Sequence, residues 1–287
     1  FITFVNEQDE NTESENTGNV LNVETVTSEG DNTESTEGSE NPTSLNITSP
    51  QETEVSTNGQ TYEEAYEQAK MEEFNKLWKN FCISTTYEPG SVAKPFTVAA
   101  GIESGKMTGN EYYTCNGQLH VGDHDIKCHN YKSGGDGTLS VQQSIEQSCN
   151  VALMLMGKQI GKATFLEYQE KFNFGLKTNI DLAGEMRTDT LVFNADTMGV
   201  TELATSTFGQ GYNVTMIQNI TAFCSVINGG YYYKPHVVKQ IVDDSGAVIQ
   251  NIEPFLLRQT ISESVSATMR EYCIGVVREG TGVNARP

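Results

Sequence analysis

The sequence predicts a mixed α/β (α+β) domain that follows a long polar, acidic segment. After residue 60, several helix-length stretches carry apolar residues three or four positions apart. Short runs of aromatic and β-branched residues, such as Tyr231–Tyr233, lie between turn residues and are typical of strands. Residues 1–60 contain 13 of the 38 acidic residues and neither Lys nor Arg, so they form a region of different character.

The first 60 residues are expected to contribute little ordered structure. Residues 6–60 are rich in Asn, Thr, Ser and Glu and poor in apolar side chains, so burial cannot offset the entropy cost of ordering them. We predict a disordered acidic insertion there. Residues 1–5, Phe-Ile-Thr-Phe-Val, have the composition of a strand and are interpreted as the remnant of a core strand. Residues 61–287 are predicted to form the folded domain.

Helices are predicted from apolar periodicity and capping residues. The stretch 213–227 has apolar residues at helical spacing and is followed by Asn228-Gly229-Gly230, a C-terminal cap and turn. The same reasoning predicts helices over residues 61–79, 96–102, 138–148, 151–160, 161–173, 213–227 and 262–277. The Leu- and Met-rich stretch 151–160 is interpreted as core.

Strands are predicted at residues 231–233 and 237–242, and a hairpin at residues 111–130. The midpoint of that hairpin is equidistant from Cys115 and Cys128, so the two cysteines are predicted to face each other. A disulfide between them would imply an oxidising compartment, and two free thiols are the alternative. Two more of the six cysteines, Cys149 and Cys224, lie among apolar residues and are interpreted as buried thiols.

A metal site on the same hairpin is a weaker interpretation. Cys115, His120, His124 and Cys128, with His129 adjacent, have compact zinc-ligand spacing. However, alternation along a strand sends His120 to the opposite face from Cys115. We therefore favour a disulfide or free thiols beside surface histidines, and we expect no metal and no cofactor.

Charge and hydropathy exclude other classes of partner. After residue 60 the chain has 25 acidic against 18 basic residues, and no basic patch is available to neutralise phosphates. Nucleic acid is therefore not an expected partner. No apolar run reaches the roughly 18 residues of a membrane span. Because the chain begins at Phe1 rather than Met, we expect it to be an internal fragment whose N-terminal membrane anchor lies upstream.

The most informative chemistry lies at residues 87–96, Tyr-Glu-Pro-Gly-Ser-Val-Ala-Lys-Pro-Phe. A serine hydroxyl is a weak nucleophile unless a neighbouring group takes its proton. Lys94 is three residues after Ser91, which places both side chains on one helix face. Pro95 is tolerated only near a helix start, so Ser91 is predicted at the helix tip. An ordinary N-cap serine followed by a solvated lysine is the alternative.

Two further segments carry polar groups at turns. Ser148-Cys149-Asn150 lies between two helical stretches and offers a hydroxyl and an amide on one connection, although a polar helix junction would look the same. Phe208-Gly209-Gln210-Gly211 is a flexible turn before a helix. It has too few glycines and no preceding strand for a phosphate-binding loop.

Taken in order, these segments resemble the transpeptidase domain of class B (monofunctional) penicillin-binding proteins. The resemblance runs from about Trp78 to Pro287 and rests on five segments: residues 87–96, Ser-Cys-Asn-Val-Ala at 148–152, Thr-Asn-Ile-Asp-Leu-x-Gly-Glu at 178–185, Phe-Gly-Gln-Gly at 208–211 followed by Val-Thr, and Arg-Glu-Gly-Thr-Gly at 278–282. It implies the penicillin-binding serine transpeptidase fold, with the helical subdomain largely present and the antiparallel sheet incomplete.

The resemblance also implies roles for individual residues. Ser91 would attack the D-Ala-D-Ala carbonyl of a peptidoglycan stem peptide, and Lys94 would take its proton. A lowered pKa of Lys94 would follow from burial and neighbouring positive charge. Ser148 would relay a proton, and Asn150 would orient Lys94 and the substrate amide. Gly209, Gln210 and Gly211 are weaker candidates for substrate contacts.

Partners and location follow from the same resemblance. β-Lactams would acylate Ser91, and the parent protein would work with other cell-wall synthesis proteins on the extracytoplasmic face of the plasma membrane. The Ser-x-x-Lys pattern also occurs in β-lactamases and β-lactam sensors, which share the fold and are the first alternative. A non-catalytic binding module with a zinc hairpin and an acidic tether is the second.

The sequence departs from the family pattern in one respect that bears on activity. No Lys-Thr-Gly occurs in the chain, whereas the family carries this motif on a strand that supplies substrate contacts and one oxyanion-hole donor. Loss of a single such donor costs about 100- to 1000-fold in rate. We therefore predict that the parent protein is an enzyme and that this chain alone, truncated before the motif, is inactive.

Overall fold

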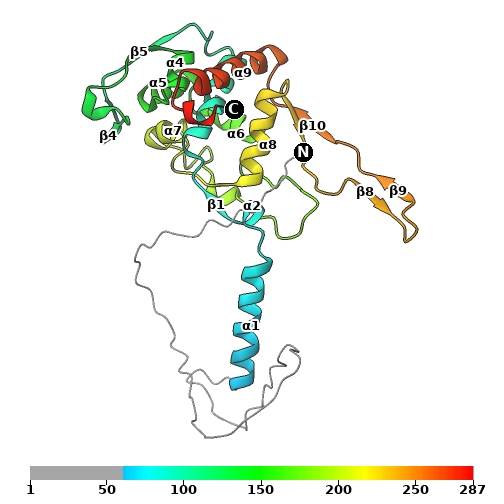
Figure 1. The fold of residues 1–287 in the computed structure, drawn as a ribbon. Coiled ribbons are helices and arrows are strands. Elements are labelled where there is room, and N and C mark those ends of the chain that lie inside the picture. Colours follow the sequence, from blue (N-terminus) through cyan, green and yellow to red (C-terminus); the bar gives the residue numbers. More distant parts are fainter. Residues whose placement is uncertain (1–60, 287) are drawn as a thin grey trace, which may run out of the picture. The chain divides into compact units, whose positions relative to one another are not determined.

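The computed structural model describes residues 61–286, which form a mixed domain of helices and short antiparallel strand pairs (Figure 1). The predicted strand remnant at 1–5 and the predicted acidic insertion at 6–60 lie outside these residues. The predicted α+β class is confirmed. Among the described residues, no helix combines the length and hydropathy needed to cross a membrane.

Most of the described residues that belong to helices or strands lie in helices. The α-helices are α1 (Tyr62–Trp78), α2 (Phe81–Ser84), α3 (Lys94–Glu103), α4 (Val141–Glu146), α5 (Asn150–Ile160), α6 (Lys162–Lys171), α7 (Val200–Ser206), α8 (Met216–Ile227) and α9 (Glu263–Arg278). Short 3-10 helices are η1 (Gly90–Ala93), η2 (Tyr131–Ser133), η3 (Asp189–Leu191) and η4 (Val283–Ala285). Several helices start at a capping serine or threonine, as the sequence pattern predicts.

The strands form five antiparallel pairs, and none of the described strands has partners on both sides. The pairs are β1 (Thr86–Tyr87) with β6 (Val214–Thr215), β2 (Tyr112–Cys115) with β5 (Gly137–Ser140), β3 (Gln118–Val121) with β4 (His124–Lys127), β7 (Tyr231–Tyr233) with β10 (Leu256–Gln259), and β8 (Gln240–Val242) with β9 (Val248–Asn251). Helices therefore supply most of the core, and the strand pairs lie around it.

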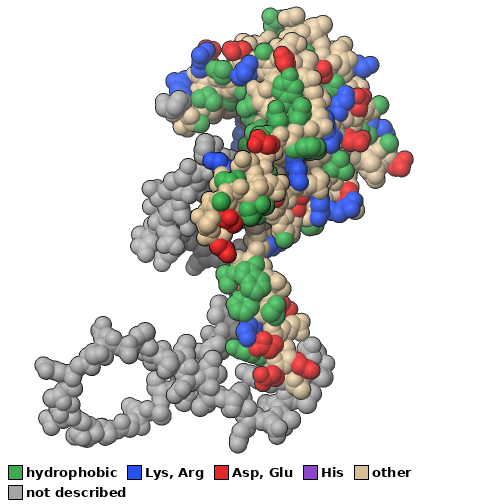
Figure 2. Space-filling view, turned by 90° about the vertical axis from the view of Figure 1, so that its right-hand side faces the viewer, with side chains coloured by type: hydrophobic (Ala, Val, Ile, Leu, Met, Phe, Trp, Pro, Cys, Tyr) green, Lys and Arg blue, Asp and Glu red, His purple; other side chains and the backbone are tan. Residues whose placement is uncertain are grey.

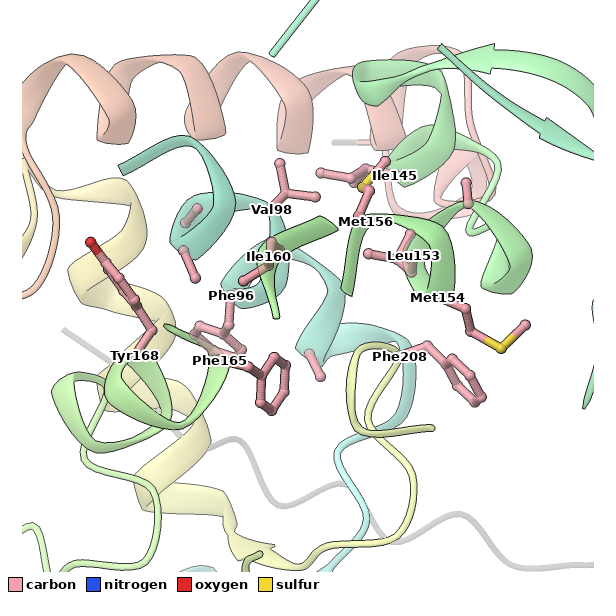
Figure 3. Close-up of a cluster of buried hydrophobic side chains, with 14 of the residues drawn as sticks. Phe96, Val98, Ile145, Leu153, Met154, Met156, Ile160, Phe165, Tyr168 and Phe208 are labelled. Carbon is pink, nitrogen blue, oxygen red and sulfur yellow. The ribbon is translucent and has the colours of Figure 1, made fainter. Parts of the chain in front are cut away.

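The hydrophobic core is built around α3 and α5, which pack against each other (Figure 3). The middle of α3 is completely buried, with Val98 at 0% exposure, and Leu153 and Met156 of α5 are also 0% exposed. The Phe96 ring packs against the tilted ring of Phe172 and edge-to-face against that of Phe174, at centroid distances of 5.1 and 5.0 Å. The helix that begins at Lys94 is thus fixed by its own buried side chains.

Close backbone packing explains two glycines in this core. A Cβ on Gly101 of α3 would collide with Met107 and Ile160, and one on Gly157 of α5 would collide with Thr207. Thr97 of α3 also donates a 2.9 Å hydrogen bond from its hydroxyl to the Thr207 carbonyl oxygen. These contacts fix α3, α5 and the segment after α7 relative to one another.

In contrast to this core, α1 and the β8–β9 pair carry exposed apolar side chains. A capping box at Thr61 starts α1, and Phe74 stacks on Trp78 with a centroid distance of 5.2 Å. Leu77 and Trp78 are nevertheless 78% and 69% exposed. Figure 2 shows hydrophobic side chains on the surface of this helix.

The predicted hairpin at residues 111–130 is wrong in its pairing. Gly117 has φ of +92° and turns the chain after β2, so the hairpin itself spans only β3 and β4. The Cys128 N–H then donates a 2.7 Å bond to the Gly117 carbonyl oxygen. Cys115 is paired across β2–β5 with Gly137, and it does not face Cys128 across a hairpin.

Several predicted element boundaries and one burial prediction are also corrected. The helix predicted over 138–148 is strand β5 followed by α4, because Ser140 leaves the strand as the N-cap of α4. The helix predicted from residue 213 begins later, because residues 214–215 form strand β6 and α8 starts after the capping box of Thr215. The strand predicted at 237–242 is limited to β8. Cys224 is exposed, contrary to prediction, whereas Cys149 is buried as predicted.

Candidate active site

The nucleophile segment is a short 3-10 turn that leads directly into a buried helix. Ser91 lies in η1 with an exposed side chain, and Lys94 is the first residue of α3 with 2% exposure. Pro95 occupies the first turn of α3, where a missing N–H costs nothing. The predicted position of Ser91 at a helix tip is confirmed, and the alternative of a solvated Lys94 is wrong.

The Phe208–Gly211 loop packs against this turn and forms hydrogen bonds with it. The Gly90 N–H donates a 2.9 Å bond to the Gly209 carbonyl oxygen, and the Gly211 N–H donates a 2.8 Å bond to Glu88 Oε1. A Cβ on Gly209 would overlap backbone atoms of Gly90, and its φ is +85°. Glycine is therefore required at position 209 both for its backbone conformation and for the close approach.

The entry to the turn is anchored by α8 and β6. Tyr87 pairs with Val214 in the β1–β6 ladder, and its hydroxyl accepts a 2.8 Å bond from Asn219 Nδ2. The Tyr-Glu-Pro-Gly lead before Ser91 therefore has a contact at its tyrosine, its glutamate and its glycine. The sequence indicated no role for Glu88 or Asn219, because their partners are distant in the chain.

A second turn, between α4 and α5, brings Ser148 to the same place. Ser148 has φ of +52°, a left-handed conformation that non-glycine residues adopt at a cost. The Ser148 N–H donates a hydrogen bond to the Ile145 carbonyl oxygen, and the Cys149 N–H donates one to the Ser144 carbonyl oxygen. These two bonds terminate α4 in a tight turn. This left-handed residue explains why α4 ends before the predicted position.

Three polar groups meet between the two turns. Lys94 Nζ donates to Ser91 Oγ at 2.9 Å, to Ser148 Oγ at 2.6 Å and to the Ser148 carbonyl oxygen at 2.7 Å. Ser148 Oγ in turn donates to Ser91 Oγ at 2.9 Å. The two hydroxyls and the amine form a closed triangle of hydrogen bonds. A proton can therefore pass from Ser91 to Lys94 directly or through Ser148.

Burial holds the pKa of Lys94 down. Removing the ammonium from water lowers the pKa of Lys94 from 10.5 to about 8. Cys128, Cys149 and Asp136 are potential anions nearby, and each raises the Lys94 pKa against this effect. The predicted contribution from neighbouring positive charge is therefore wrong, because the neighbouring ionisable groups are acidic. Near neutral pH, an appreciable fraction of Lys94 is still the neutral amine that a general base must be.

The sequence matches a known family over nearly its whole length. Residues 16–286 match the penicillin binding protein transpeptidase domain. The chain belongs to this family. It is 35% identical over 210 residues to stage V sporulation protein D of Bacillus subtilis strain 168, covering 72% of this chain and 32% of that protein. It is also 27% identical over 190 residues to peptidoglycan D,D-transpeptidase MrdA of Escherichia coli K12, covering 61% of this chain and 29% of that protein.

Solved structures support the same fold. The D,D-transpeptidase domain of a peptidoglycan glycosyltransferase from Eggerthella lenta superposes with a TM-score of 0.70 at 21% identity, covering 79% of this chain and 57% of that chain. The predicted penicillin-binding transpeptidase fold is thus confirmed. The chain spans about a third of the length of the curated relatives it matches.

Asn150 and Gln210, two further candidates in this transpeptidase-family chain, do not join the triangle, although Asn150 is two residues from Ser148 and Gln210 lies on the loop that contacts the Ser91 turn. Asn150 is the first residue of α5, and its backbone N–H donates to Cys128 Sγ at 3.3 Å. Within residues 61–286, no hydrogen bond joins the Asn150 side chain to Lys94. Gln210 is exposed on the supporting loop. The roles of Asn150 and Gln210 stay predictions.

Cys115 and Cys128 are both free and buried, so the disulfide alternative does not describe this structure. The sulfur atoms of these two cysteines lie close to the sulfur of Cys149 and to a carboxylate oxygen of Asp136. All four atoms lie within 4.8 Å of one another. Cys128 Sγ and Cys149 Sγ share a hydrogen bond at 3.8 Å, which lowers the pKa of the Cys128 thiol and raises that of Cys149. Sequence reasoning missed Asp136 and assigned Cys149 only to the core.

Another family segment, residues 178–185, has a structural role here. The buried Glu185 carboxylate accepts bonds from the Thr178 N–H at 2.5 Å, the Thr178 hydroxyl at 2.7 Å and the Asn179 N–H at 2.9 Å. Asp181 accepts from the N–H groups of Val237 and Val238 at 2.8 and 2.9 Å. These carboxylates fix loops and do not face the triangle formed by Ser91, Lys94 and Ser148.

Proposed function

We propose that this chain carries the nucleophile, base and proton relay of a serine D,D-transpeptidase that cross-links peptidoglycan stem peptides ending in D-Ala-D-Ala. The observation that carries the proposal is the hydrogen-bonded triangle of Ser91, Lys94 and Ser148 around a buried amine. Relatives named as peptidoglycan D,D-transpeptidases support the choice of substrate.

The acylation step follows from the geometry of the triangle. Neutral Lys94 takes the Ser91 proton as Oγ attacks the carbonyl carbon of the penultimate D-Ala. The tetrahedral intermediate then collapses, the C–N bond breaks, and the terminal D-Ala leaves as an amine. Ser148 Oγ contacts both Lys94 Nζ and Ser91 Oγ, so it can pass the proton from the Lys94 ammonium to the leaving nitrogen.

The second step uses the same groups in reverse. The amine of another stem peptide attacks the Ser91 ester and loses a proton through Ser148 to Lys94. The ester C–O bond breaks, the new amide is the cross-link, and Ser91 regains its proton. Because Ser91 is exposed whereas Lys94 is buried, both peptides can reach the hydroxyl while the base stays desolvated.

Further parts of the proposal concern the substrate and the setting. Asn150 orients the substrate amide from the start of α5, and Gln210 contacts the peptide from the supporting loop. β-Lactams acylate Ser91 as substrate mimics.

The full-length protein acts on the extracytoplasmic face of the plasma membrane with other cell-wall synthesis proteins. Because the sequence contains no Lys-Thr-Gly, the 287-residue chain alone is expected to acylate far more slowly than the full-length protein.

The test is acylation of the full-length protein by a fluorescent penicillin, followed by release of the label. We expect stoichiometric labelling that Ser91→Ala abolishes and that persists for hours. Cross-linking of purified stem peptides should depend on the same serine. No labelling of the folded full-length protein would refute the proposal. Rapid release of the label with turnover of penicillin would instead identify a β-lactamase.

A further inference from the structure

Helix α9 contacts the helices next to both catalytic turns. It packs against α3, which begins at Lys94, and against α4, which ends just before Ser148 (Figure 1). At its start, the Ser262 N–H and the Ser262 hydroxyl both donate to Glu103 Oε2, at 2.8 and 2.6 Å. Glu103 is the last residue of α3. The amino end of α9 is therefore anchored to the helix that begins at Lys94.

The carboxyl end of α9 contacts the last turn of α4. The Arg-Glu-Gly-Thr-Gly segment at 278–282 begins at the last residue of α9. Within this segment, the Thr281 N–H donates a 2.9 Å bond to the Glu146 carbonyl oxygen. Glu146 is the last residue of α4 and lies two positions before Ser148. A backbone hydrogen bond therefore joins the segment to the turn that carries the relay hydroxyl.

Two glycines allow the two backbones to approach this closely. A Cβ on Gly280 would overlap the Glu146 carbonyl group, and one on Gly275 of α9 would overlap the Glu146 carboxylate. Neither glycine has a positive φ, so the requirement is for space rather than for a special backbone conformation. The Glu146 side chain is buried, and its Oε1 accepts a 2.7 Å bond from Gln142 Nε2. Glu146 is therefore enclosed between α4 and the end of α9.

The segment is also fixed to α9 on both sides of Thr281. Before it, the Gly280 N–H donates a 3.2 Å bond to the Gly275 carbonyl oxygen. After it, the Gly282 N–H donates a 3.0 Å bond to the Val276 carbonyl oxygen. Thr281 is thus held by α9, and its own N–H holds the end of α4.

The Ser148 turn requires support of this kind. Ser148 has φ of +52°, and a strained conformation persists only where the surrounding structure enforces it. Its hydroxyl must also stay within hydrogen-bond distance of two partners, Lys94 Nζ at 2.6 Å and Ser91 Oγ at 2.9 Å. A shift of about 1 Å at the end of α4 would disturb both bonds, and misplacement of this size can slow a reaction about 100-fold.

We propose that Gly280 and Thr281 are positioning residues for the relay hydroxyl of Ser148. They hold the last turn of α4 through Glu146, and the hydroxyl therefore stays within reach of the Lys94 amine. The inference rests on the proposed transpeptidase function, in which Ser148 passes the proton. It gives the segment at 278–282 a role in the reaction without contact with the substrate.

The first test compares acylation by a fluorescent penicillin in variants of the full-length protein. Gly280→Ala adds a methyl group that overlaps the Glu146 carbonyl, so the segment must move away from α4. We expect acylation about tenfold slower than in the wild-type protein. Gly282→Ala is the matched control from the same segment, because the nearest neighbours of its Cβ are atoms of Val276 on α9, none closer than 3.1 Å. Its rate should stay within about twofold of wild type.

A double-variant cycle separates positioning from general destabilisation. If Gly280 acts through the Ser148 hydroxyl, Gly280→Ala should slow acylation no further once Ser148→Ala has removed that hydroxyl. Gly209→Ala, which acts on the Ser91 turn, should keep its own effect in the Ser148→Ala background. A further loss of about tenfold in the Gly280→Ala/Ser148→Ala protein would overturn the proposal, because independent effects multiply. A wild-type rate in Gly280→Ala alone would also overturn it.

If Gly280→Ala fails to fold, hydrogen exchange in the wild-type protein decides the question. The Thr281 and Ser148 amides should both be protected and should open together, because one movement of the end of α4 exposes both. A Thr281 amide that exchanges as fast as an unprotected loop amide would contradict the proposal. Wild-type labelling is the reference throughout: its absence would refute the transpeptidase function, whereas normal labelling with a wild-type rate in Gly280→Ala refutes the positioning role alone.

Discussion

Two turns each deliver a hydroxyl to Lys94, but they are held in place by different means. The turn of Ser91 is held by packing, because Gly209 lies against Gly90 and α3 continues into the core. The turn of Ser148 is held by a left-handed residue whose neighbour, Cys149, lies in a cluster of polar sulfur and carboxylate groups. Both turns are hydrogen-bonded, but the first also depends on close backbone packing and the second includes a strained backbone conformation.

This difference predicts how the stability of each turn should respond to amino-acid substitutions. A turn fixed by close packing is sensitive to an added methyl group and insensitive to the chemistry of its surroundings. A turn held in a strained conformation can gain stability when the strain is removed, even as its function is lost. The predictions below separate these two behaviours, beginning with the amine that both turns share.

The largest effect is expected for Lys94→Arg in the full-length protein. Arginine keeps the positive charge but does not deprotonate, so the general base is lost. The second-order rate constant for penicillin acylation should fall by about 100- to 10,000-fold. Lys158→Arg, at an exposed position of α5, is the matched control and should acylate normally. Retained activity in Lys94→Arg would exclude Lys94 as the base.

Ser148→Ala and Ser148→Gly test the strained turn as a pair. Both remove the relay hydroxyl, and acylation should fall by about 100-fold in each. Only glycine adopts φ of +52° without strain, so Ser148→Gly should be about 1 kcal/mol more stable than Ser148→Ala in denaturant unfolding. Equal stability of the two variants would show that the turn relaxes when the hydroxyl is removed.

The pH dependence of acylation tests the buried amine itself. The neutral form of Lys94 is the active base, and burial lowers its pKa to about 8. The rate constant should therefore rise about tenfold from pH 6 to pH 7 and level off above pH 8. Measurement with a pH-stable penicillin from pH 6 to 9 checks this. A rate that stays constant over this range would mean that another group limits the step.

The smallest effect on rate is expected for Gly209→Ala, which tests the packed turn. The added Cβ would overlap the Gly90 backbone, and the loop must shift. We expect a loss of about 1–3 kcal/mol in stability and a several-fold slower acylation. Gly246→Ala is the matched control, because Gly246 has the same φ of +85° with open space around its Cβ. An equal loss in the control would attribute the effect to backbone strain alone.

The parts of the fold that depend on local sequence were predictable. The spacing of Ser91 and Lys94, with prolines on both sides, was sufficient to place Ser91 in the turn that leads into α3 and Lys94 at the start of that helix. The helices α1, α5, α6 and α9 begin and end within two residues of their predicted limits. Apolar periodicity and capping residues lie close together in the chain, so they can be recognised without knowing the fold.

The parts that depend on distant contacts were not predictable in this way. Spacing around residue 121 predicted that Cys115 faces Cys128, but β2 pairs with β5, whose residues were assigned to a helix. The approach of Gly209 to Gly90 and the convergence of Asp136 with the thiols are likewise products of folding. No periodicity in the sequence reports contacts between segments that are far apart along the chain.

The two prolines around the nucleophile affect the unfolded protein as much as the folded one. Pro89 is the N-cap of η1 and Pro95 lies in the first turn of α3, so each already has a backbone angle φ close to the one required. The unfolded chain has fewer conformations to lose at this segment than elsewhere. The loss of conformational entropy on ordering the segment around Ser91 is therefore smaller than it would be without the two prolines.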